Sequence, residues 1–384
     1  MPWKETDKME QREQFVRETL THNKPFRHLC TEYNISHKTG YKWMQRFEEY
    51  GWNGFSEASR QPGKSPKRLS EEVVCDLIGL KTDHMSWGAK KILTLYMRRH
   101  PHNPLSLSSV NRIFKRAGLV KTRRRRNYPK AGARLINHIE AKEPNDLWTI
   151  DFKGWWKTSD DKRFEPLTLR DNYSRYLLLT EAMPQTTEHV KKALIKAFRC
   201  YGLPRVIQSD NGSPFGARSN VLGLSKLSAW LISLGINIHF TRPGKPQDNG
   251  GHERMHRDLK EEVQVRFKGD FKLYQAELDM WREEFNTVRP HESLNMKTPA
   301  EVYVKSKRKY HEDLSEIDYP AEYQIRKVGK HGHIKLFNDY YFITTALQGY
   351  PVGLKVADSD KFDVYFSDLM LGTLNLNTIS FKAV

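Results

Sequence analysis

Cysteine is scarce in this chain, and its three cysteines lie far apart. They are Cys30, Cys75 and Cys200. No two of them have the close C-x-x-C spacing of zinc-binding modules, so we expect no zinc site. Each falls at an apolar position of a predicted helix, and we therefore expect reduced, buried thiols, as in cytoplasmic proteins.

Long apolar segments are also missing. No run of about 18 apolar residues occurs, which is the length that a membrane-spanning helix requires. The opening residues MPWKE are not followed by an apolar stretch, so no secretory signal is expected. We expect a cytoplasmic protein without a membrane partner.

Acidic residues are too few to balance the basic ones. The 384 residues include 64 Lys and Arg against 46 Asp and Glu, a formal net charge of +18. Such an excess favours a polyanionic partner, because Lys and Arg displace the counterions of phosphates. A membrane surface is the competing polyanion. The length allows roughly two to four domains.

Three acids stand at the ends of apolar segments or at the start of a helix. Asp151 lies in LWTIDF (147–152) and Asp210 ends VIQSD (206–210), and both segments read as buried strands. Glu253 follows the loop PGKPQDNGG (243–251) and opens a helical pattern. If these carboxylates converge, they form an oxygen-ligand site for a hard divalent cation.

The chemistry of such a cluster is restrictive. Carboxylates a few Å apart cannot all stay ionised without a counter-charge. Mg²⁺ or Mn²⁺ supplies that charge and prefers oxygen ligands. Two such ions, roughly 3.5–4 Å apart, can hold the attacking and leaving oxygens of a phosphoryl transfer. We predict Asp151, Asp210 and Glu253 as catalytic residues and as ligands of two ions, although most acids of any chain lie at the solvated surface.

Other residues near these acids are competing candidates. Asp171 follows a strand pattern, and we expect it to cap a turn. Asp248 belongs to the turn sequence DNG. His252 and His256 flank Glu253, and we expect them to contact DNA or to support the ligands rather than to bind the metal.

Segments around the three acids resemble DDE transposases and retroviral integrases. GLP (202–204), SDNG (209–212) and Phe215 resemble the block around the second aspartate. Three segments resemble the glutamate block of these proteins: PQDNG (246–250), ERMH (253–256) and LK (259–260). Three further features resemble the segment that closes this core in insertion-sequence transposases: RPH (289–291), Leu294 and TP (298–299). The order of segments over nearly the whole chain is most similar to the insertion sequence 481 family, although the stretch from Asp210 to Glu253 is somewhat longer than usual there.

This resemblance implies an RNase H-like core in which Asp151 and Asp210 are adjacent, and a DNA-contacting lysine at Lys260. The residue pattern agrees with such a core. Strand patterns at 147–154, 164–171 and 175–182 precede alternating helix and strand patterns, which describes a mixed sheet covered on both faces.

The helix that begins near Glu253 has two faces. An apolar stripe is formed by Met255, Leu259 and Val263. A different face carries Glu253, Arg257 and Lys260. We predict that Arg257 and Lys260 contact DNA phosphates beside the metal site.

Residues 9–51 read as three short helices of a helix-turn-helix unit. Ser36 can cap the third helix, which is expected to end at Gly51. This helix is expected to turn three side chains inward: Tyr41, Met44 and Phe47. The predicted contacts with a DNA major groove are Lys38, Thr39, Lys42, Gln45 and Arg46. A plain three-helix bundle with a solvated basic face is the alternative.

Residues 70–119 read as a second helix-turn-helix unit, and a basic run follows it. The run contains Arg123, Arg124, Arg125 and Arg126. We predict that these arginines follow DNA phosphates or enter a narrow minor groove. A solvated charged segment is the alternative.

From about residue 320 the pattern changes to short strands separated by turns. We expect a small β-barrel there, of the SH3-like kind found at the C-terminus of integrases, which binds DNA or a second protomer. The predicted domains are therefore two helix-turn-helix units (1–60 and 61–120), a basic linker (121–142), an α/β RNase H-like core (143–305) and the barrel (306–384).

These observations predict a DNA transposase. It would bind terminal inverted repeats, cleave the 3′ strand at the element ends and join the 3′-OH to target DNA, acting as at least a dimer on double-stranded DNA. One alternative is a domesticated regulator that keeps DNA binding only. Another is a nuclease of the RNase H class, which usually needs a fourth carboxylate on the first core helix. Glu188 is the only acid there.

Overall fold

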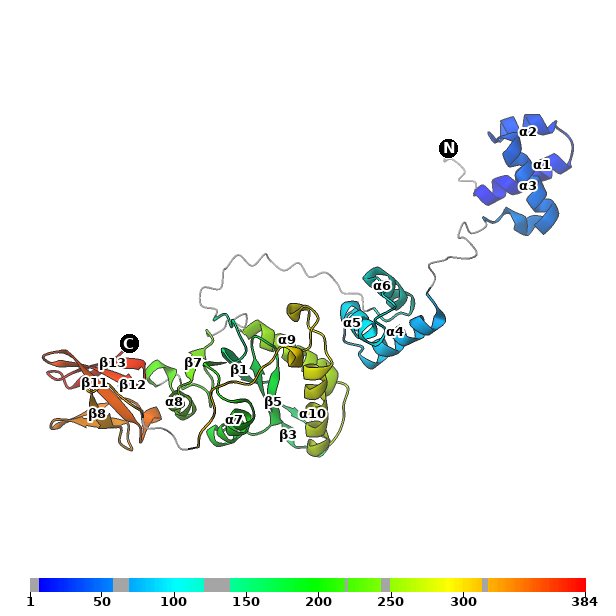
Figure 1. The fold of residues 1–384 in the computed structure, drawn as a ribbon. Coiled ribbons are helices and arrows are strands. Elements are labelled where there is room, and N and C mark those ends of the chain that lie inside the picture. Colours follow the sequence, from blue (N-terminus) through cyan, green and yellow to red (C-terminus); the bar gives the residue numbers. More distant parts are fainter. Residues whose placement is uncertain (1–6, 58–68, 121–138, 218–219, 243–248, 313–316) are drawn as a thin grey trace. The chain divides into compact units, whose positions relative to one another are not determined.

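The computed structural model describes residues 7–57, 69–120, 139–217, 220–242, 249–312 and 317–384 (Figure 1). The chain divides into two compact units, Met1–Ser70 and Glu71–Val384. No helix of the described residues is long and apolar enough to cross a membrane.

The first unit contains the three predicted helices, α1 (Lys8–Leu20), α2 (Phe26–Glu32) and α3 (His37–Tyr50), and a 3-10 turn over Gly51–Phe55. The Ser36 side chain caps α3 by accepting a hydrogen bond from the Thr39 N–H. The prediction for Tyr41 was wrong, because this side chain is 65% exposed and Trp43 is buried instead. The inward face of α3 is set by Gly40, whose missing Cβ leaves room for Phe26.

The second unit begins with α4 (Glu71–Asp83), α5 (Ala89–Arg99) and α6 (Leu107–Arg116). Ser106 caps α6 through the Ser109 N–H. The apolar centre of these helices includes Leu77, Trp87 and Phe114. The cysteine prediction was correct for Cys30 only: Cys75 and Cys200 are exposed, since each lies on the solvent side of its helix.

The core of the second unit is a five-stranded mixed sheet in the order β5-β4-β1-β6-β7. The strands are β1 (Leu147–Phe152), β4 (Pro166–Asp171), β5 (Leu177–Ala182), β6 (Val206–Ser209) and β7 (Asn237–Phe240). β1 pairs antiparallel with β4 and parallel with β6. This is the mixed sheet that the sequence predicts.

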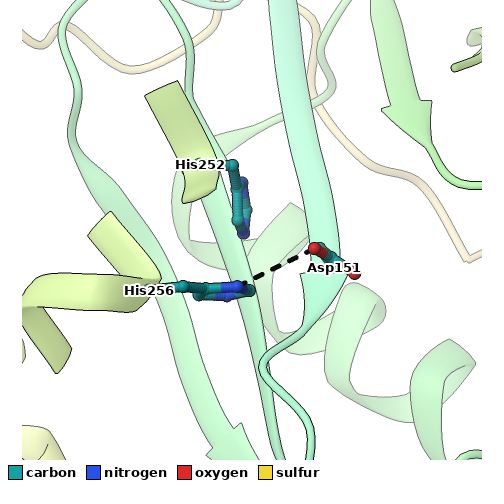
Figure 2. Close-up of side chains that lie close together, drawn as sticks. All are labelled: Asp151, His252 and His256. Carbon is teal, nitrogen blue, oxygen red and sulfur yellow. Dashed lines mark ion pairs between the residues drawn. The ribbon is translucent and has the colours of Figure 1, made fainter. Parts of the chain in front are cut away.

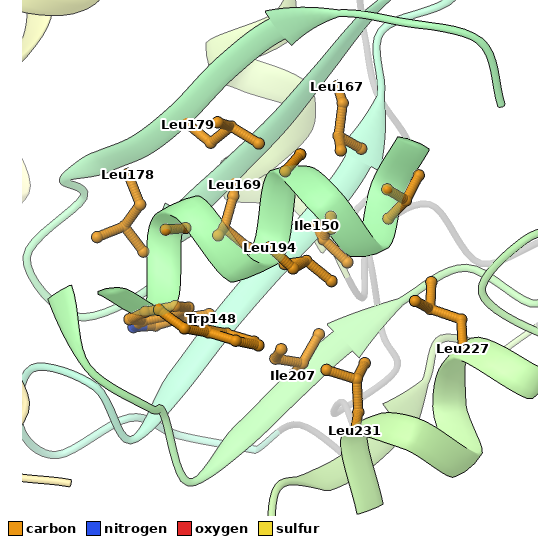
Figure 3. Close-up of a cluster of buried hydrophobic side chains, with 14 of the residues drawn as sticks. Trp148, Ile150, Leu167, Leu169, Leu178, Leu179, Leu194, Ile207, Leu227 and Leu231 are labelled. Carbon is orange, nitrogen blue, oxygen red and sulfur yellow. The ribbon is translucent and has the colours of Figure 1, made fainter. Parts of the chain in front are cut away.

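Helices cover both faces of this sheet. On one face, α7 (Thr187–Tyr201) and α8 (Lys226–Ser233) pack on Trp148 and Ile150 (Figure 3). On the other, α9 (Gly250–Leu259) and α10 (Phe271–Thr287) pack on Leu177. A π-helical turn, Lys260–Gln264, continues α9. Short elements complete the core: β2 (Trp156–Lys157), β3 (Arg163–Phe164) and 3-10 turns over Val221–Gly223, Glu292–Leu294 and Pro299–Glu301.

The C-terminal region is all β apart from a 3-10 turn over Thr345–Leu347. Its strands are β8 (Gln324–Lys327), β9 (His333–Leu336), β10 (Asp339–Phe342), β11 (Pro351–Asp358), β12 (Lys361–Phe366), β13 (Leu369–Asn375) and β14 (Ser380–Ala383). They form a sheet in the order β14-β13-β12-β11-β8 and a separate β9–β10 hairpin. The predicted barrel is not confirmed, because the hydrogen-bonded ladders of the described residues do not close. A turn through Gly329 and Gly332 separates β9 from the short strand β8.

Asp171 holds the end of β4 rather than belonging to the acidic cluster. Its buried carboxylate accepts hydrogen bonds from the Asn145 N–H (2.7 Å), the Ser174 N–H (2.7 Å) and the Ser174 hydroxyl (2.5 Å). The carboxylate thereby closes the turn between β4 and β5, as the sequence predicts.

Replacing Asp171 by Ala should lower the free energy of unfolding by about 2–4 kcal/mol, because buried N–H groups lose their acceptor. Urea denaturation of both proteins measures this difference. The matched control is Glu188→Ala on the exposed start of α7, which should change stability by less than about 0.5 kcal/mol. Equal stability of the Asp171→Ala and control proteins would contradict this account of the turn.

Candidate metal centre

Two of the predicted ligands lie at the same edge of the sheet. Asp151 is near the carboxyl end of β1, and Asp210 directly follows β6. The parallel register pairs Thr149 with Gln208, and continuing it by two residues brings Asp151 level with Asp210. The apolar residues before each aspartate are buried in the sheet, and this burial fixes where each strand ends.

Glu253 is brought to the same edge by α9. It lies in the first turn of this helix and is exposed, whereas Met255 and Leu259 are buried against the sheet. Burial, followed by the negative charges of Asp210 and Glu253, raises the pKa of Asp151 to about 7, against the lowering effect of the Phe152 N–H and of Lys153.

The three carboxylates form no ion pair with a Lys or Arg of the described residues, although the charge of Lys153 acts on Asp151. Among the described residues, the Asp210 carboxylate accepts a single hydrogen bond, from the Gly212 N–H at 3.2 Å. Carboxylate oxygens are the ligands that a hard divalent cation prefers, so these three acids are suited to hold one.

Two histidines point from α9 toward Asp151 (Figure 2). The Thr168 hydroxyl lies 2.7 Å from His252 Nε2 and 2.8 Å from His256 Nε2, and it donates to the Asp151 carbonyl at 3.0 Å. The other ring nitrogen of His252, Nδ1, lies 2.9 Å from the Thr149 hydroxyl. These contacts fix the start of α9 against β1 and β4, so the histidines hold the helix that carries Glu253.

Both imidazoles are kept neutral. Burial lowers the pKa of His256 to about 3, and the charges of Lys153 and Arg170 act in the same direction. Burial, His256 and Arg170 hold the pKa of His252 well below its usual value. The 3.8 Å contact between His256 Nδ1 and Asp151 is therefore not a charged pair, and it is too long for a hydrogen bond.

Asp151, His252 and His256 are also close enough to offer a mixed nitrogen and oxygen group, with ligand atoms within 4.8 Å of one another. Both nitrogens of His252 already face threonine hydroxyls. Mg²⁺ prefers oxygen ligands, so the carboxylate side of Asp151 suits it better. The prediction that the histidines contact DNA does not fit their burial.

The opposite side of α9 is held by a buried ionic cluster. Arg289 donates to Asp258 at 2.7 Å and to Glu262 at 2.8 Å. Glu262 also accepts from Trp281 at 2.6 Å and from the Ser86 hydroxyl, which lies between α4 and α5. This cluster holds the side of α9 that carries Asp258, and Glu253 on the other side stays exposed.

The predicted DNA contacts fall into three groups. Arg257 and Lys260 are exposed on α9, as is Glu253. On α3, Lys38, Lys42 and Gln45 are exposed, Thr39 bonds the Ser36 hydroxyl, and Arg46 donates to the Ser56 carbonyl and lies over the Trp43 ring. The four arginines Arg123, Arg124, Arg125 and Arg126 lie outside the described residues.

Lys153 is a site residue that sequence reasoning missed. It is half-buried, and its pKa is lowered by burial and by Lys260 but raised by Asp151. The signal available in the sequence was its position two residues after Asp151, which places both on one face of an extended segment. Lys153 and Lys260 together give the edge of the site a positive charge.

Several known proteins are similar to parts of this chain. Two integrase core domain families match residues 141–246 and 234–299, a homeodomain-like family matches residues 39–114, and a helix-turn-helix family matches residues 11–63. The uncharacterized 31.7 kDa protein of insertion element IS407 from Burkholderia multivorans is 25% identical over 71% of this chain and 92% of its own length. The transposase for insertion sequence element IS21 from Pseudomonas aeruginosa is 24% identical over 54% of this chain and 55% of its own length. The magnesium complex of the HTLV-2 integrase catalytic core is 16% identical, with a TM-score of 0.34 over 43% of this chain and 100% of that chain.

Divalent cation binding should depend on pH through Asp151. Folded Asp151 keeps its proton up to about pH 7, whereas the unfolded chain loses it near about pH 4, so the cation-free protein loses stability as pH rises between these values. A cation must displace that proton below pH 7. Its affinity should therefore fall roughly tenfold per pH unit there and level off above about pH 8.

Calorimetric titration with Mn²⁺ at about pH 6, 7 and 8 measures this dependence. Asp151→Asn, which cannot ionise, should bind weakly at every pH. Affinity of the unmodified protein that does not change between about pH 6 and 8 would contradict the role given to Asp151.

Proposed function

We propose that this chain, in which residues 141–246 and 234–299 match integrase core domains and which is similar to insertion-element proteins, mobilises DNA by end cleavage and strand transfer. It binds the terminal inverted repeats of its element, cleaves the 3′ strand at each end and joins the 3′-OH to target DNA. The observation that supports this proposal is that Asp151 near the end of β1, Asp210 directly after β6 and Glu253 in the first turn of α9 lie close enough for the charges of Asp210 and Glu253 to raise the pKa of Asp151. Within these proteins, the order of the segments favours the insertion sequence 481 family.

The residues proposed to hold the metal are Asp151, Asp210 and Glu253. Their oxygens suit two Mg²⁺ or Mn²⁺ ions. Bound there, the cations would offset negative charge on the attacking and leaving oxygens of an in-line phosphoryl transfer. The neutral pair His252 and His256 holds the start of α9 against β1, so that Glu253 stays near the two aspartates.

Cationic side chains around the carboxylates are proposed to hold the DNA. Arg257 and Lys260 share the exposed side of α9 with Glu253, and Lys153 lies near Lys260. They would place the phosphates that flank the scissile bond while the carboxylates face the bond itself. The charge of +18 on the whole chain favours the same partner.

The remaining regions are assigned to DNA recognition and assembly. We place the two DNA-reading units at 1–60 and 61–120, with Lys38, Lys42 and Gln45 of α3 toward a major groove. The basic linker 121–142 follows phosphates, and the catalytic core spans 143–305. The β region 306–384, proposed to act as an SH3-like module, contacts DNA or a second protomer. Joining two element ends requires at least a dimer on DNA, and the protein acts in the cytoplasm.

Two other functions are weaker. A domesticated regulator would need no acidic cluster, and carboxylates that raise the pKa of Asp151 are costly to keep without a use for them. A nuclease of the RNase H class usually needs a fourth acid on the first core helix. Glu188 on α7 is exposed and pairs with Lys192 at 2.7 Å instead.

Replacing Asp210 by Asn should abolish strand transfer and leave the binding of element ends unchanged, because it removes a proposed metal ligand and no DNA-reading residue. An in vitro reaction with Mg²⁺ and labelled end DNA measures transfer, and a gel-shift assay measures end binding. Asp161→Asn, at an exposed turn, is the matched control and should keep both activities. Strand transfer by the Asp210→Asn protein would refute the proposed role of Asp210 as a metal ligand. If the Asp210→Asn protein no longer binds element ends, the role of Asp210 is not purely catalytic.

A further inference from the structure

A buried arginine beside the metal centre has no carboxylate partner. Arg170 on β4 is only 3% exposed. Its guanidinium donates to two neutral oxygens, the Gly251 carbonyl at 2.5 Å and Asn172 Oδ1 at 3.2 Å. Its Nε has no hydrogen-bond partner among the described residues. An isolated buried charge is strongly unfavourable unless an opposite charge joins it.

A second arginine increases the imbalance. Arg175 donates to the same Asn172 oxygen at 3.2 Å. Burial, followed by the charge of Arg175, lowers the pKa of Arg170 to about 9, against the opposing charge of Asp171, which also acts on Arg175. Within the described ranges, no Asp or Glu forms an ion pair with either guanidinium.

Both arginines line a cavity of about 480 Å³. Lys91 of α5 and Arg254 of α9 also line it, and Arg254 lies 3.6 Å from the Asp258 carboxylate. Two acids line it as well, but both are already paired, Asp258 with Arg289 and Glu292 with Lys90. The cavity is therefore positively charged.

The start of α9 opens onto this cavity. Asn249, at the N-terminal cap, makes no capping hydrogen bond through its side chain among the described residues, and the first N–H groups of a helix need an acceptor from outside the helix. Gly251 lets the backbone approach closely, because a Cβ there would lie 2.6 Å from the Arg170 guanidinium. The N-terminus of a helix carries a partial positive charge and favours an anion. Here it lies against the Arg170 guanidinium, which is also positive, so the two repel each other.

His291 contributes another unused nitrogen to the same cavity. Its Nε2 is buried and has no hydrogen-bond partner in the described part of the chain. Burial, followed by the charge of Lys91, lowers the pKa of this ring to about 3, so the imidazole is neutral. A neutral ring can donate one hydrogen bond to an anion. This gives the RPH segment a role at the cavity.

We propose that this cavity binds a phosphate of the DNA backbone, held by Arg170, Arg175 and the first turn of α9. Thr149, which lines the cavity, precedes Asp151 by two residues on the same face of β1, and Gly251 precedes Glu253 by two residues. A phosphate seated there therefore belongs to the strand that enters the metal centre. The identity of the anion rests on the proposed function. The need for an anion rests on the two guanidinium groups, which share Asp171 as their nearby negative charge, and on the unpartnered nitrogens of Arg170 and His291 among the described residues.

The first test uses the full chain without DNA and inorganic phosphate as the probe. Phosphate should raise the melting temperature of the unmodified protein. Arg170→Met should be at least as stable as the unmodified protein in phosphate-free buffer, because it removes a charge that the fold alone does not balance. It should also bind phosphate at least tenfold more weakly. Arg175→Gln, at a half-buried position, should weaken phosphate binding in the same direction, and Arg199→Gln on the exposed side of α7 should not.

Lower stability of Arg170→Met without phosphate would overturn the proposal, because the arginine would then be a structural hydrogen-bond donor. Unchanged phosphate affinity in both Arg170→Met and Arg175→Gln would overturn it as well. Neither result depends on catalysis, so failure here is separate from failure of the Asp210→Asn experiment.

The second test identifies the DNA phosphate. End DNA is prepared from the sequence that flanks the gene, with one phosphate at a time replaced by a neutral methylphosphonate. Replacing the phosphate at one position near the cleavage site should lower the DNA affinity of the unmodified protein at least tenfold. The same replacement should not change the DNA affinity of the Arg170→Met protein. It should lower the affinity of the Arg199→Gln protein as much as that of the unmodified protein. If inorganic phosphate binds but no DNA position behaves in this way, the cavity serves a free anion and the assignment to DNA is wrong.

Discussion

Carboxylates that lie close together in a partly buried site repel one another. The structure of this site depends on the packed sheet, which holds the acids near one another against that repulsion. Asp151 carries the clearest sign of it, since burial and the charges of Asp210 and Glu253 together raise its pKa to about 7. The sheet can impose this arrangement because buried apolar side chains fix β1 and β6 side by side in parallel. The fold therefore holds the acids in place before any cation arrives, and a bound cation relieves a repulsion that the folded chain already contains.

Helix α9 connects this electrostatic arrangement to the rest of the molecule. One side presents Glu253, Arg257 and Lys260, and the buried side contacts β1 and β4 through two neutral histidines. A third side is held by Arg289 through Asp258 and Glu262. Ser86 and Trp87, between α4 and α5, contact the same cluster, so these two helices and α9 share one buried ionic centre.

The parts predicted well from sequence are those set by local pattern. Apolar runs before Asp151 and Asp210 placed two strands, and the stripe of Met255, Leu259 and Val263 gave the buried side of α9. The sheet order also follows from the succession of strands and helices. The inward Tyr41 and the buried Cys75 and Cys200 were wrong, because exposure depends on neighbours that are remote in sequence. The barrel is not confirmed, because strand patterns do not tell whether a sheet closes. Lys153 and Arg170 were missed because the contacts that bring them to the site come from residues remote in sequence. The strands β2 and β3 were missed because each has two residues, too few for an alternating pattern of apolar and polar residues.

The account depends most directly on where a divalent cation binds. Anomalous diffraction from crystals of the protein grown with Mn²⁺ locates the ion without reference to activity. We predict manganese held by Asp151, Asp210 and Glu253, with His252 and His256 remaining hydrogen-bonded to threonine hydroxyls. Manganese on the nitrogen group of Asp151, His252 and His256, with Glu253 turned away, would contradict it.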